Sequence, residues 1–502
     1  MAAQPTPEPI VSSPIARGAP RWLLPVGLAA LLVGCATPPS EPPADVLPAG
    51  WQAPLPHGGQ AARMADWWSQ FDDPLLTRLI DTAQRQNPTL AQATARIRQA
   101  RAAAQASGAA RWPSLDARAG VSRSSTELPP SPGVQTSGSV SLDALWEIDL
   151  FGSVRHGVAA AEARAAGSLA QWHNARVSLA AEVANAYVGL RTCEAVLAVY
   201  EQDAASLANT AGLTQQKVKA GFDAPANLAL ANASAAEAAN RVVAQRADCD
   251  VAVKQLVQLT ALPEAGLREQ LAARRALLPR PGALSVASVP AELLSQRPDL
   301  AASEREIAAA SSDVGAARAD RFPRLSLAGS IGRAGVRVAG DTVSGNTWSI
   351  GPSLLAPLFD AGRRRAAVDA AEARYDEAVA AYRERALAAV REVEESLVRL
   401  DAAEKREADA ERAAQGYAEF LAAAETQWRV GTGSLLDLEQ ARRSALAARA
   451  GLLQVQRERV AAWLALYKAM GGGWSRDAAG TATTAALAPA DTQGNPNPNT
   501  NR

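Results

Sequence analysis

The residue types that most often carry catalysis or bind metals are few and scattered in this chain. The three histidines, His57, His156 and His173, stand far apart, and three cysteines add little to a metal-ligand set. The sequence has no Gly-x-Ser-x-Gly, no His-Glu-x-x-His and no Gly-Lys pair for a phosphate loop. The adjacent acids Glu394 and Glu395 lie in a charged helical stretch, and a solvent-exposed helix face accounts for them better than catalysis does. We therefore expect no enzyme, no catalytic residue, no metal site and no cofactor.

The first cysteine suits a different chemistry, the attachment of lipid. Two arginines precede an apolar run over residues 22–33, which is too short to span a bilayer and leads into Leu32-Val33-Gly34-Cys35. This order resembles a bacterial lipobox, so we expect a signal peptide over 1–34 and a covalent lipid on Cys35. Ala36 stands where an Asp would retain the protein at the inner membrane, which points to the outer membrane. The alternative is a buried cysteine after an apolar strand.

Composition narrows the remaining classes. The chain has 51 basic and 51 acidic side chains, so a basic surface for nucleic acid is not expected. Much of its 48% apolar content is Ala and aromatics are only 5%, which favours thin, closely packed helices. Beyond the expected signal peptide, no apolar run approaches the roughly 18 residues of a membrane-spanning helix.

The elements that position these residues occur twice, because a shift of about 210 residues superposes the two halves of the chain. The matches are Asn87-Pro88 with Arg297-Pro298, Arg111-Trp112-Pro113 with Arg321-Phe322-Pro323, Glu162-Ala163-Arg164 with Glu372-Ala373-Arg374, and Gly221 with Gly431. The shift becomes shorter by two only near Phe151 and Phe359. We therefore expect the same order of elements in each half.

Each half begins its pattern with a helix and then changes to a period of two. Leu115, Ala117, Ala119 and Val121 alternate with polar or small residues. A similar alternation occurs in residues 140–148, 325–332 and 347–358. Each segment has about the 9–11 residues of a tilted transmembrane strand. The alternation predicts two β-hairpins, about 113–150 and 323–360. A soluble hairpin with one wet face stays open as an alternative.

Long helices follow each hairpin. Residues 153–219 and 363–429 carry no proline and span about 100 Å each as helices. Gly221 and Gly431 should break them, and return helices should end near 260 and 469. A further helix is expected over 74–110, with Asp73 as its N-cap, and another over 291–320.

Two cysteines test this hairpin geometry. Cys193 and Cys249 lie equally far from Gly221 along the sequence, one before it and one after it, so they stand at one height in an antiparallel helical hairpin that turns there. Both lie on apolar seams, and the periplasm is oxidising. We expect a disulfide between them. Two reduced core thiols are the alternative.

Four strands per chain cannot close a barrel, and an open sheet edge in lipid leaves backbone groups without partners. If the strands enter a membrane, several copies must share one barrel. Three copies would give twelve strands, enough to leave a lumen. Helices of about 100 Å would then extend that lumen away from the membrane as a tube.

With these features, the chain resembles the outer-membrane factor family, the TolC- and OprM-like channels, in its lipoprotein branch. The residues that carry the resemblance are Asp66-Trp67-Trp68, Phe71, Asp73-Pro74, Trp146-Glu147-Ile148-Asp149-Leu150-Phe151-Gly152, Gln296-Arg297-Pro298-Asp299-Leu300, Phe322-Pro323, Pro357-Leu358-Phe359-Asp360-Ala361-Gly362-Arg363 and Gly471-Gly472-Gly473-Trp474. Their order, together with the duplication and the lipobox, makes the resemblance specific.

The resemblance implies a mostly α-helical homotrimer with a twelve-stranded β-barrel and a periplasmic α-helical barrel. It implies an outer-membrane exit channel of a tripartite efflux pump in a Gram-negative bacterium, with a periplasmic adaptor and an inner-membrane transporter of the RND type. Drugs or other small toxic compounds would pass through it passively. Type I protein secretion or metal-ion efflux is the alternative duct role, and a structural coiled-coil lipoprotein that tethers the envelope is a second alternative.

The resemblance also assigns roles at the hairpin turns. The family's second turn carries Gly and, six positions later, Asp, which Gly431 and Asp437 match. A further acid often follows, but Gln440 stands there, which weakens the case for cation selectivity. We expect Asp437 at a periplasmic gate, with a helix N-cap as its alternative role, and Asp223 as a weaker gate candidate. The expected adaptor contacts are Gly221, Phe222, Gly431, Thr432 and Gly433.

The expected domain boundaries follow the repeat. They are 1–34 for the signal peptide, 35–73 for a lipidated tether and equatorial segment, 74–261 for the first repeat, 262–290 for an equatorial connector, 291–470 for the second repeat, and 471–502 for an equatorial segment with a disordered tail.

Overall fold

The computed structural model describes residues 68, 70–126, 133–279, 296–338 and 340–474. They belong to two compact units. The strand unit comprises Pro113–His156 and Ser311–Ala371, and the helical unit comprises the described residues of Ser40–Trp112, Gly157–Ala310 and Glu372–Arg502.

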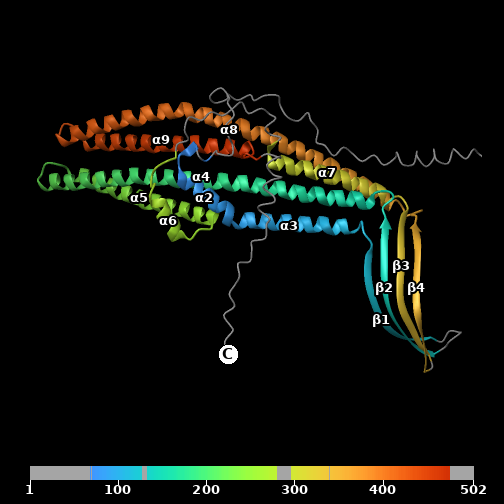
Figure 1. Ribbon diagram of the computed structural model, residues 1–502. Helices are drawn as coiled ribbons and strands as arrows, with labels where there is room; N and C mark the ends of the chain where they lie inside the picture. The colour runs from blue at the N-terminus through green and yellow to red at the C-terminus, as the bar shows by residue number, and fades with distance from the viewer. Residues whose placement is uncertain (1–67, 69, 127–132, 280–295, 339, 475–502) are drawn as a thin grey trace, which may run out of the picture. The chain divides into compact units, whose positions relative to one another are not determined.

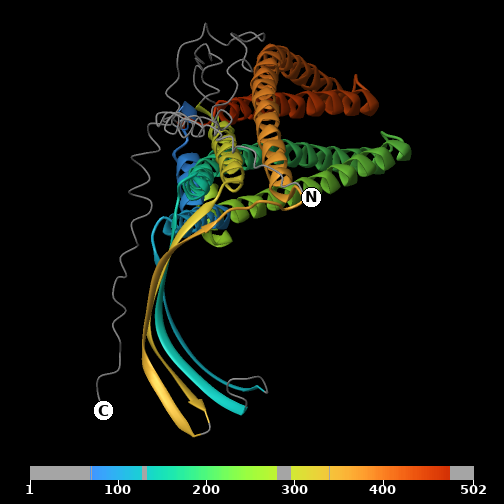
Figure 2. The same cartoon turned by 90° about the vertical axis from the view of Figure 1, so that its right-hand side faces the viewer.

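The strand unit holds one antiparallel sheet, in which the spatial order β1-β2-β3-β4 is also the chain order (Figure 1). The strands are β1 (Ser114–Thr126), β2 (Gly133–Ile148), β3 (Arg324–Val338) and β4 (Asp341–Leu355), and Figure 2 shows the sheet curving along their length. They contain 13, 16, 15 and 15 residues, more than the alternation predicts. The extra residues are rich in Ser, Gly and Thr. They do not show the alternation of apolar and polar side chains, but their backbones still pair with the neighbouring strand.

The duplication extends to the strand register. The first hairpin pairs Ser114 with Leu145, and the second pairs Arg324 with Leu355, so both partners are displaced by the same repeat length. β2 and β3 join the two halves at close range, since a Cβ added to Gly332 would clash with the carbonyl oxygen of Val140. β1 and β4 form the two edges of the sheet.

The expected single helix over 74–110 is two helices. They are α2 (Pro74–Gln86) and α3 (Pro88–Ala109), and Asn87 between them is extended, with φ −65° and ψ 126°. The single-helix prediction was wrong here because a residue before proline disfavours the helical region, and Pro88 has no N–H to continue the ladder. Asn87 also accepts a backbone N–H of α3 at 2.8 Å, as an N-cap does.

The long helices have the predicted bounds. α4 (Ser153–Lys219) and α8 (Arg363–Arg429) have 67 residues each. α5 (Pro225–Thr260) and α9 (Leu435–Ala469) return beside them, as Figures 1 and 2 show. The remaining helices are α6 (Glu264–Ala272) in the expected connector and α7 (Pro298–Ala319).

The main core of the helical unit gathers side chains from α2–α9, and Tyr187, Leu256 and Trp463 are almost completely buried within it. The prediction of Asp73 as the N-cap of α2 is confirmed. Its carboxylate accepts the N–H of Leu75 at 3.0 Å and the hydroxyl of Tyr187 at 2.8 Å. The cap therefore also fixes α2 against α4. None of the helices in the described ranges is both long and apolar enough to cross a bilayer.

Candidate functional site at the tips of the helical hairpins

Each helical hairpin turns through a glycine in the left-handed region. Gly221 has φ +76° and Gly431 has φ +80°, a conformation that a Cβ makes unfavourable. The next residues, Phe222 and Thr432, donate their N–H groups to carbonyls of the preceding helix at 2.8 and 2.9 Å. Gly433 has a steric reason of its own, because a Cβ there would lie 3.1 Å from the Cβ of a residue at the end of α8. Small residues are thus required where the second hairpin turns.

Asp437 lies in the first turn of α9 and takes part in its capping. Ser434 is the N-cap: its Oγ accepts the N–H of Asp437 at 3.1 Å, and the Asp437 carboxylate accepts the Ser434 N–H at 3.4 Å. The N-cap position that the sequence allowed for Asp437 therefore belongs to Ser434, and Asp437 is the acidic member of a capping box. Its side chain is exposed.

Asp223 is engaged within its own turn. Its carboxylate accepts the side-chain amide of Asn227 at 2.6 Å and the N–H of Ala224 at 2.8 Å. Asn227 is the first-half counterpart of Asp437 in the repeat. The first turn thus carries its acid before the return helix, whereas the second carries it within the helix.

The ends of α4, α5, α8 and α9 share a small apolar cluster near the turns. Its buried members are Ala211, Ala231, Ala424, Trp428, Leu435, Leu438 and Ala441. Lys217 of α4 places its Nζ 4.6 Å from the centre of the Trp428 ring, a cation–π contact. Near the turns, the two hairpins therefore pack through the Trp428 ring, two leucines and four alanines.

Beyond this cluster the turns expose apolar side chains. Phe222 is 85% exposed, Val430 69% and Leu436 63%. Exposed apolar side chains at these turns are compatible with a surface that another protein covers. The exposed Phe222 and the small residues around Gly431 are among the expected adaptor contacts, and the structure presents them on the surface.

Sequence reasoning missed the polar link between the hairpins. Arg442 of α9 is buried, and its guanidinium donates to Thr210 Oγ1 at 2.9 Å and to Ser206 Oγ at 3.0 Å on α4. It also forms ion pairs with Glu425 and Glu439, each at 3.4 Å. Nothing in the local sequence separates Arg442 from the exposed arginines around it, since its partners lie on other helices. A buried guanidinium with four partners holds α9 against α4 in one geometry.

A cavity of 270 Å³ lies beside this link, lined by side chains of α4, α8 and α9 that include Gln202, Asp203 and Arg449. Burial raises the pKa of Asp203, while Arg241 and Arg442 act in the opposite direction. Arg241 binds the Asp203 carboxylate at 3.2 Å. The polar groups between the hairpins are therefore connected to both return helices.

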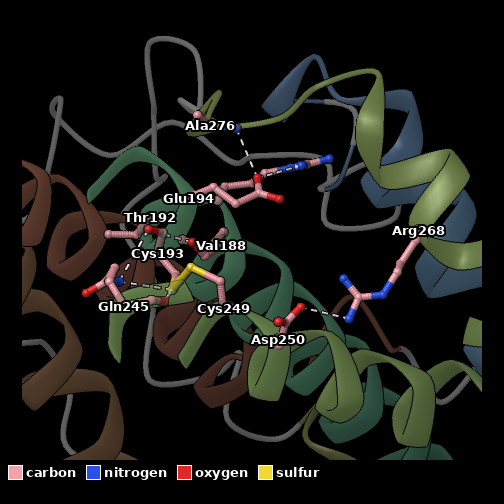
Figure 3. Close-up of a disulfide and its surroundings, with 10 residues drawn as sticks. Val188, Thr192, Cys193, Glu194, Gln245, Cys249, Asp250, Arg268 and Ala276 are labelled. Carbon is pink, nitrogen blue, oxygen red and sulfur yellow. Dashed lines mark hydrogen bonds and ion pairs between the residues drawn. A yellow bond between two sulfur atoms is a disulfide. The ribbon is translucent and has the colours of Figure 1, made fainter. Parts of the chain in front are cut away.

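Cys193 of α4 and Cys249 of α5 are joined by a disulfide, with Cα atoms 5.5 Å apart (Figure 3). This is the pair that the spacing around Gly221 predicts. The Gln245 side chain donates to the Cys193 Sγ at 3.0 Å and to the Cys193 carbonyl oxygen at 3.3 Å. The bond and this amide together fix α4 against α5.

Cys35 and the expected signal peptide lie outside the described residues, as do the connector segment 280–295 and the tail from 475. Within the described ranges, no group of three or more His, Cys, Asp or Glu side chains is placed to hold a metal ion.

Comparison with known proteins shows which proteins this chain resembles. The chain matches the family described as Outer membrane efflux protein over residues 79–262 and 289–472. It is 30% identical over 468 residues to the pyoverdine export outer membrane protein OpmQ of Pseudomonas putida, covering 91% of this chain and 98% of that one. It is 31% identical over 469 residues to the toluene efflux pump outer membrane protein TtgI of Pseudomonas putida, covering 90% and 98%. The solved outer-membrane channel OprN superposes with a TM-score of 0.75 at 30% identity, covering 88% and 98%.

Proposed function

The chain belongs to the outer membrane efflux protein family, so it is an exit duct rather than an enzyme, and we propose that three copies build one channel of a tripartite pump. The observation that carries the proposal is the sheet, whose edge strands β1 and β4 each have a single neighbour among the described strands. Such edges are not viable in lipid, and three copies would close twelve strands into a barrel with a lumen. We propose that the protein resides in the outer membrane of a Gram-negative bacterium and that a lipid on Cys35 anchors it there.

The proposed partners dock at the hairpin turns. A periplasmic adaptor would contact Gly221, Phe222, Gly431, Thr432 and Gly433, and an RND-type inner-membrane transporter would supply the energy. The exposed Phe222 ring and the short side chains of the second turn support close approach by another helical hairpin.

The proposed cargo is small toxic compounds, which the duct passes without chemistry. Relatives named for pyoverdine export and toluene efflux support a small-molecule cargo. Selection among compounds would then reside in the transporter.

The proposed gate is a ring of three Asp437 carboxylates, one from each copy. A ring of carboxylates would attract cations into the opening. The mutual repulsion of the carboxylates would also act against closure, so that a small change could open the gate. The exposed side chain of Asp437 at the tip supports this role. Asp223 would line the same opening in a lesser role, because its turn already engages its carboxylate.

Conductance in a planar bilayer tests the gate, with two variants that separate charge from capping. Asp437→Asn removes the charge but keeps an amide oxygen for the cap, and we expect a higher single-channel conductance and weaker cation preference. Ser434→Ala breaks the capping box but keeps the carboxylate, and we expect unchanged conductance. Equal effects of the two variants would assign Asp437 to capping alone.

Dye export tests the channel function as a whole. Cells that lack their own exit duct, but retain an adaptor and transporter, should regain export of a fluorescent dye when this protein is expressed. Purified protein should also conduct ions in a planar bilayer. Protein that reaches the outer membrane yet neither conducts nor restores export with any tested pump would favour a tethering role.

A further inference from the structure

The four strands divide their side chains between two faces of different character. The pairing from β1 to β4 runs without a bulge, so directly paired residues share a face and each strand alternates regularly between the faces. The apolar face carries Ala117, Leu142, Ile331 and Trp348, which form one row across the sheet. The polar face carries every acidic residue of the strands: Asp116, Asp143, Glu147 and Asp341.

The basic residues of the strands, all arginines, fall into two sets. Arg118 and Arg324 lie on the polar face, and each has a carboxylate partner. Arg118 Nε is 3.4 Å from Asp143, and Arg324 Nη2 is 2.7 Å from Asp320. The apolar face carries the other set, which we call the arginine site: Arg123, Arg333 and Arg337. All three are exposed, and none of them forms an ion pair with any residue that the structure describes.

The three residues of the arginine site lie near one another, towards the ends of the strands where the hairpins turn. Arg123 and Arg337 are paired with the same residue, Thr136, from its two sides. Two strand spacings separate them, which is about 10 Å. Arg333 lies about 13 Å from Arg337 along β3. A long arginine side chain covers half of either separation, so the three guanidinium groups can converge on one ligand.

Small and hydroxyl-bearing residues occupy the surface between these arginines. Gly335 lies between Arg333 and Arg337 on the same face and is paired with Gly138, so this part of the surface has no side chain. Ser344 accepts Nη2 of Arg333 at 3.2 Å, which orients that guanidinium across the sheet. The site therefore combines concentrated positive charge with open space.

The position of the arginines along the strands matches a membrane boundary. Arg333 lies about 26 Å along β3 from Leu325, which is about 20 Å along the axis of a barrel whose strands tilt by about 40°. The same estimate gives about 30 Å for Arg337. The apolar band of a membrane barrel is about 25 Å tall. Trp348, which is 77% exposed, lies one step before Arg333 on the same face, as an interfacial aromatic residue would.

We propose that the arginine site binds the phosphate groups of a lipid in the outer leaflet, the glycolipid lipid A. The proposal rests on the membrane barrel proposed above, in which the apolar face meets lipid and the hairpin turns face outwards. Guanidinium groups bind phosphate through paired N–H donors, and no carboxylate on this face of the strands competes for them. A head group with two phosphates matches three cations that would otherwise repel each other. Each chain carries one site, so a channel of three copies binds three lipids.

Native mass spectrometry of the delipidated channel, titrated with defined lipids, tests the proposal. The lipids are bisphosphorylated lipid A, the same molecule without its phosphates, and phosphatidylglycerol as another anionic lipid. We expect lipid A to bind at up to three copies per channel. The dephosphorylated form should bind about ten-fold more weakly, because it lacks the charged hydrogen bonds, and phosphatidylglycerol about three-fold more weakly.

Two double variants locate the site. Arg333→Gln/Arg337→Gln removes two arginines of the apolar face, and we expect lipid A to bind about ten-fold more weakly. Arg118→Gln/Arg324→Gln removes the two arginines of the polar face, and lipid A binding should stay unchanged. The mass of the trimer and its conductance in a planar bilayer check that each variant assembles.

Equal binding of lipid A and its dephosphorylated form to the unaltered channel would overturn the proposal without need of a variant. Equal losses in the two double variants would also overturn it. Phosphatidylglycerol that binds as tightly as lipid A would overturn the assignment to the outer-leaflet lipid. Each of these results leaves a conducting trimer standing, whereas unaltered protein that neither forms trimers nor conducts would overturn the proposed channel as well.

Discussion

The two helical hairpins are held together differently at the same height. In the first, the Cys193–Cys249 disulfide joins α4 to α5. The counterparts of these cysteines in the second half are Ala403 and Arg459. Arg459 joins α9 to α8 through ion pairs, with Nη1 2.8 Å from Glu407 and Nη2 3.5 Å from Glu404. Equivalent levels of the two hairpins are thus joined by a covalent bond in one half and by ion pairs in the other.

This difference teaches that duplicated hairpins need not share mechanical properties. A disulfide is insensitive to salt, whereas partly exposed ion pairs weaken as salt screens them. The first hairpin should therefore resist separation under conditions that loosen the second. Three predictions test this contrast, and they are arranged by expected effect.

The largest effect is expected from breaking the disulfide. The double variant Cys193→Ser/Cys249→Ser should lower the free energy of unfolding by about 2–4 kcal/mol, because a closed loop of 56 residues is opened in the unfolded chain. Thermal unfolding followed by circular dichroism measures the change. Reductant should reproduce it in the unaltered protein and have no effect on the variant. Equal melting temperatures with and without reductant would show that the bond contributes nothing.

An intermediate effect on stability is expected from a change of pH. The responsible residue, His173, also lies in the first half of the chain. Burial, with a smaller contribution from Arg176, lowers the pKa of His173 from 6.5 to about 4. The folded protein then resists protonation that the unfolded chain accepts, so stability is full above about pH 6.5 and falls as pH drops towards 4. After discounting for solvent, we expect a loss of about 2 kcal/mol.

The second-half counterpart of His173 is not a histidine but the exposed Arg383. His173→Gln should therefore flatten the stability profile between pH 6.5 and 4. Melting temperatures of both proteins across that range measure it. A variant that keeps the full slope would place the titrating group elsewhere.

The smallest effect is expected in the second hairpin. Arg459→Gln should cost about 0.5–1 kcal/mol at low salt, since its ion pairs are partly exposed, and less at about 1 M salt. The exposed neighbour Arg457 supplies the control, and Arg457→Gln should change stability by less than about 0.5 kcal/mol. A loss at Arg459 that is independent of salt would argue for packing by its stem instead.

Elements that rest on a residue pattern recurring many times along the chain were predictable from the sequence. Single contacts between distant helices were not. The long helices, their glycine turns and the cysteine pair follow from periodicity and from equal spacing around Gly221. The break at Asn87 depends on one residue before a proline, and the cap at Ser434 depends on which hydroxyl meets the first N–H groups. Arg442 could not be singled out, because its burial depends on Ser206 and Thr210, which belong to the other half of the chain.

The central claim is that three copies share one lipid-anchored channel, and native mass spectrometry of protein gently extracted from outer membranes tests it most directly. We predict a particle of three chains, each beginning at an acylated Cys35. A single chain beginning at Cys35 would keep the anchor but contradict the shared barrel, and the envelope tether would then become the better account of this protein.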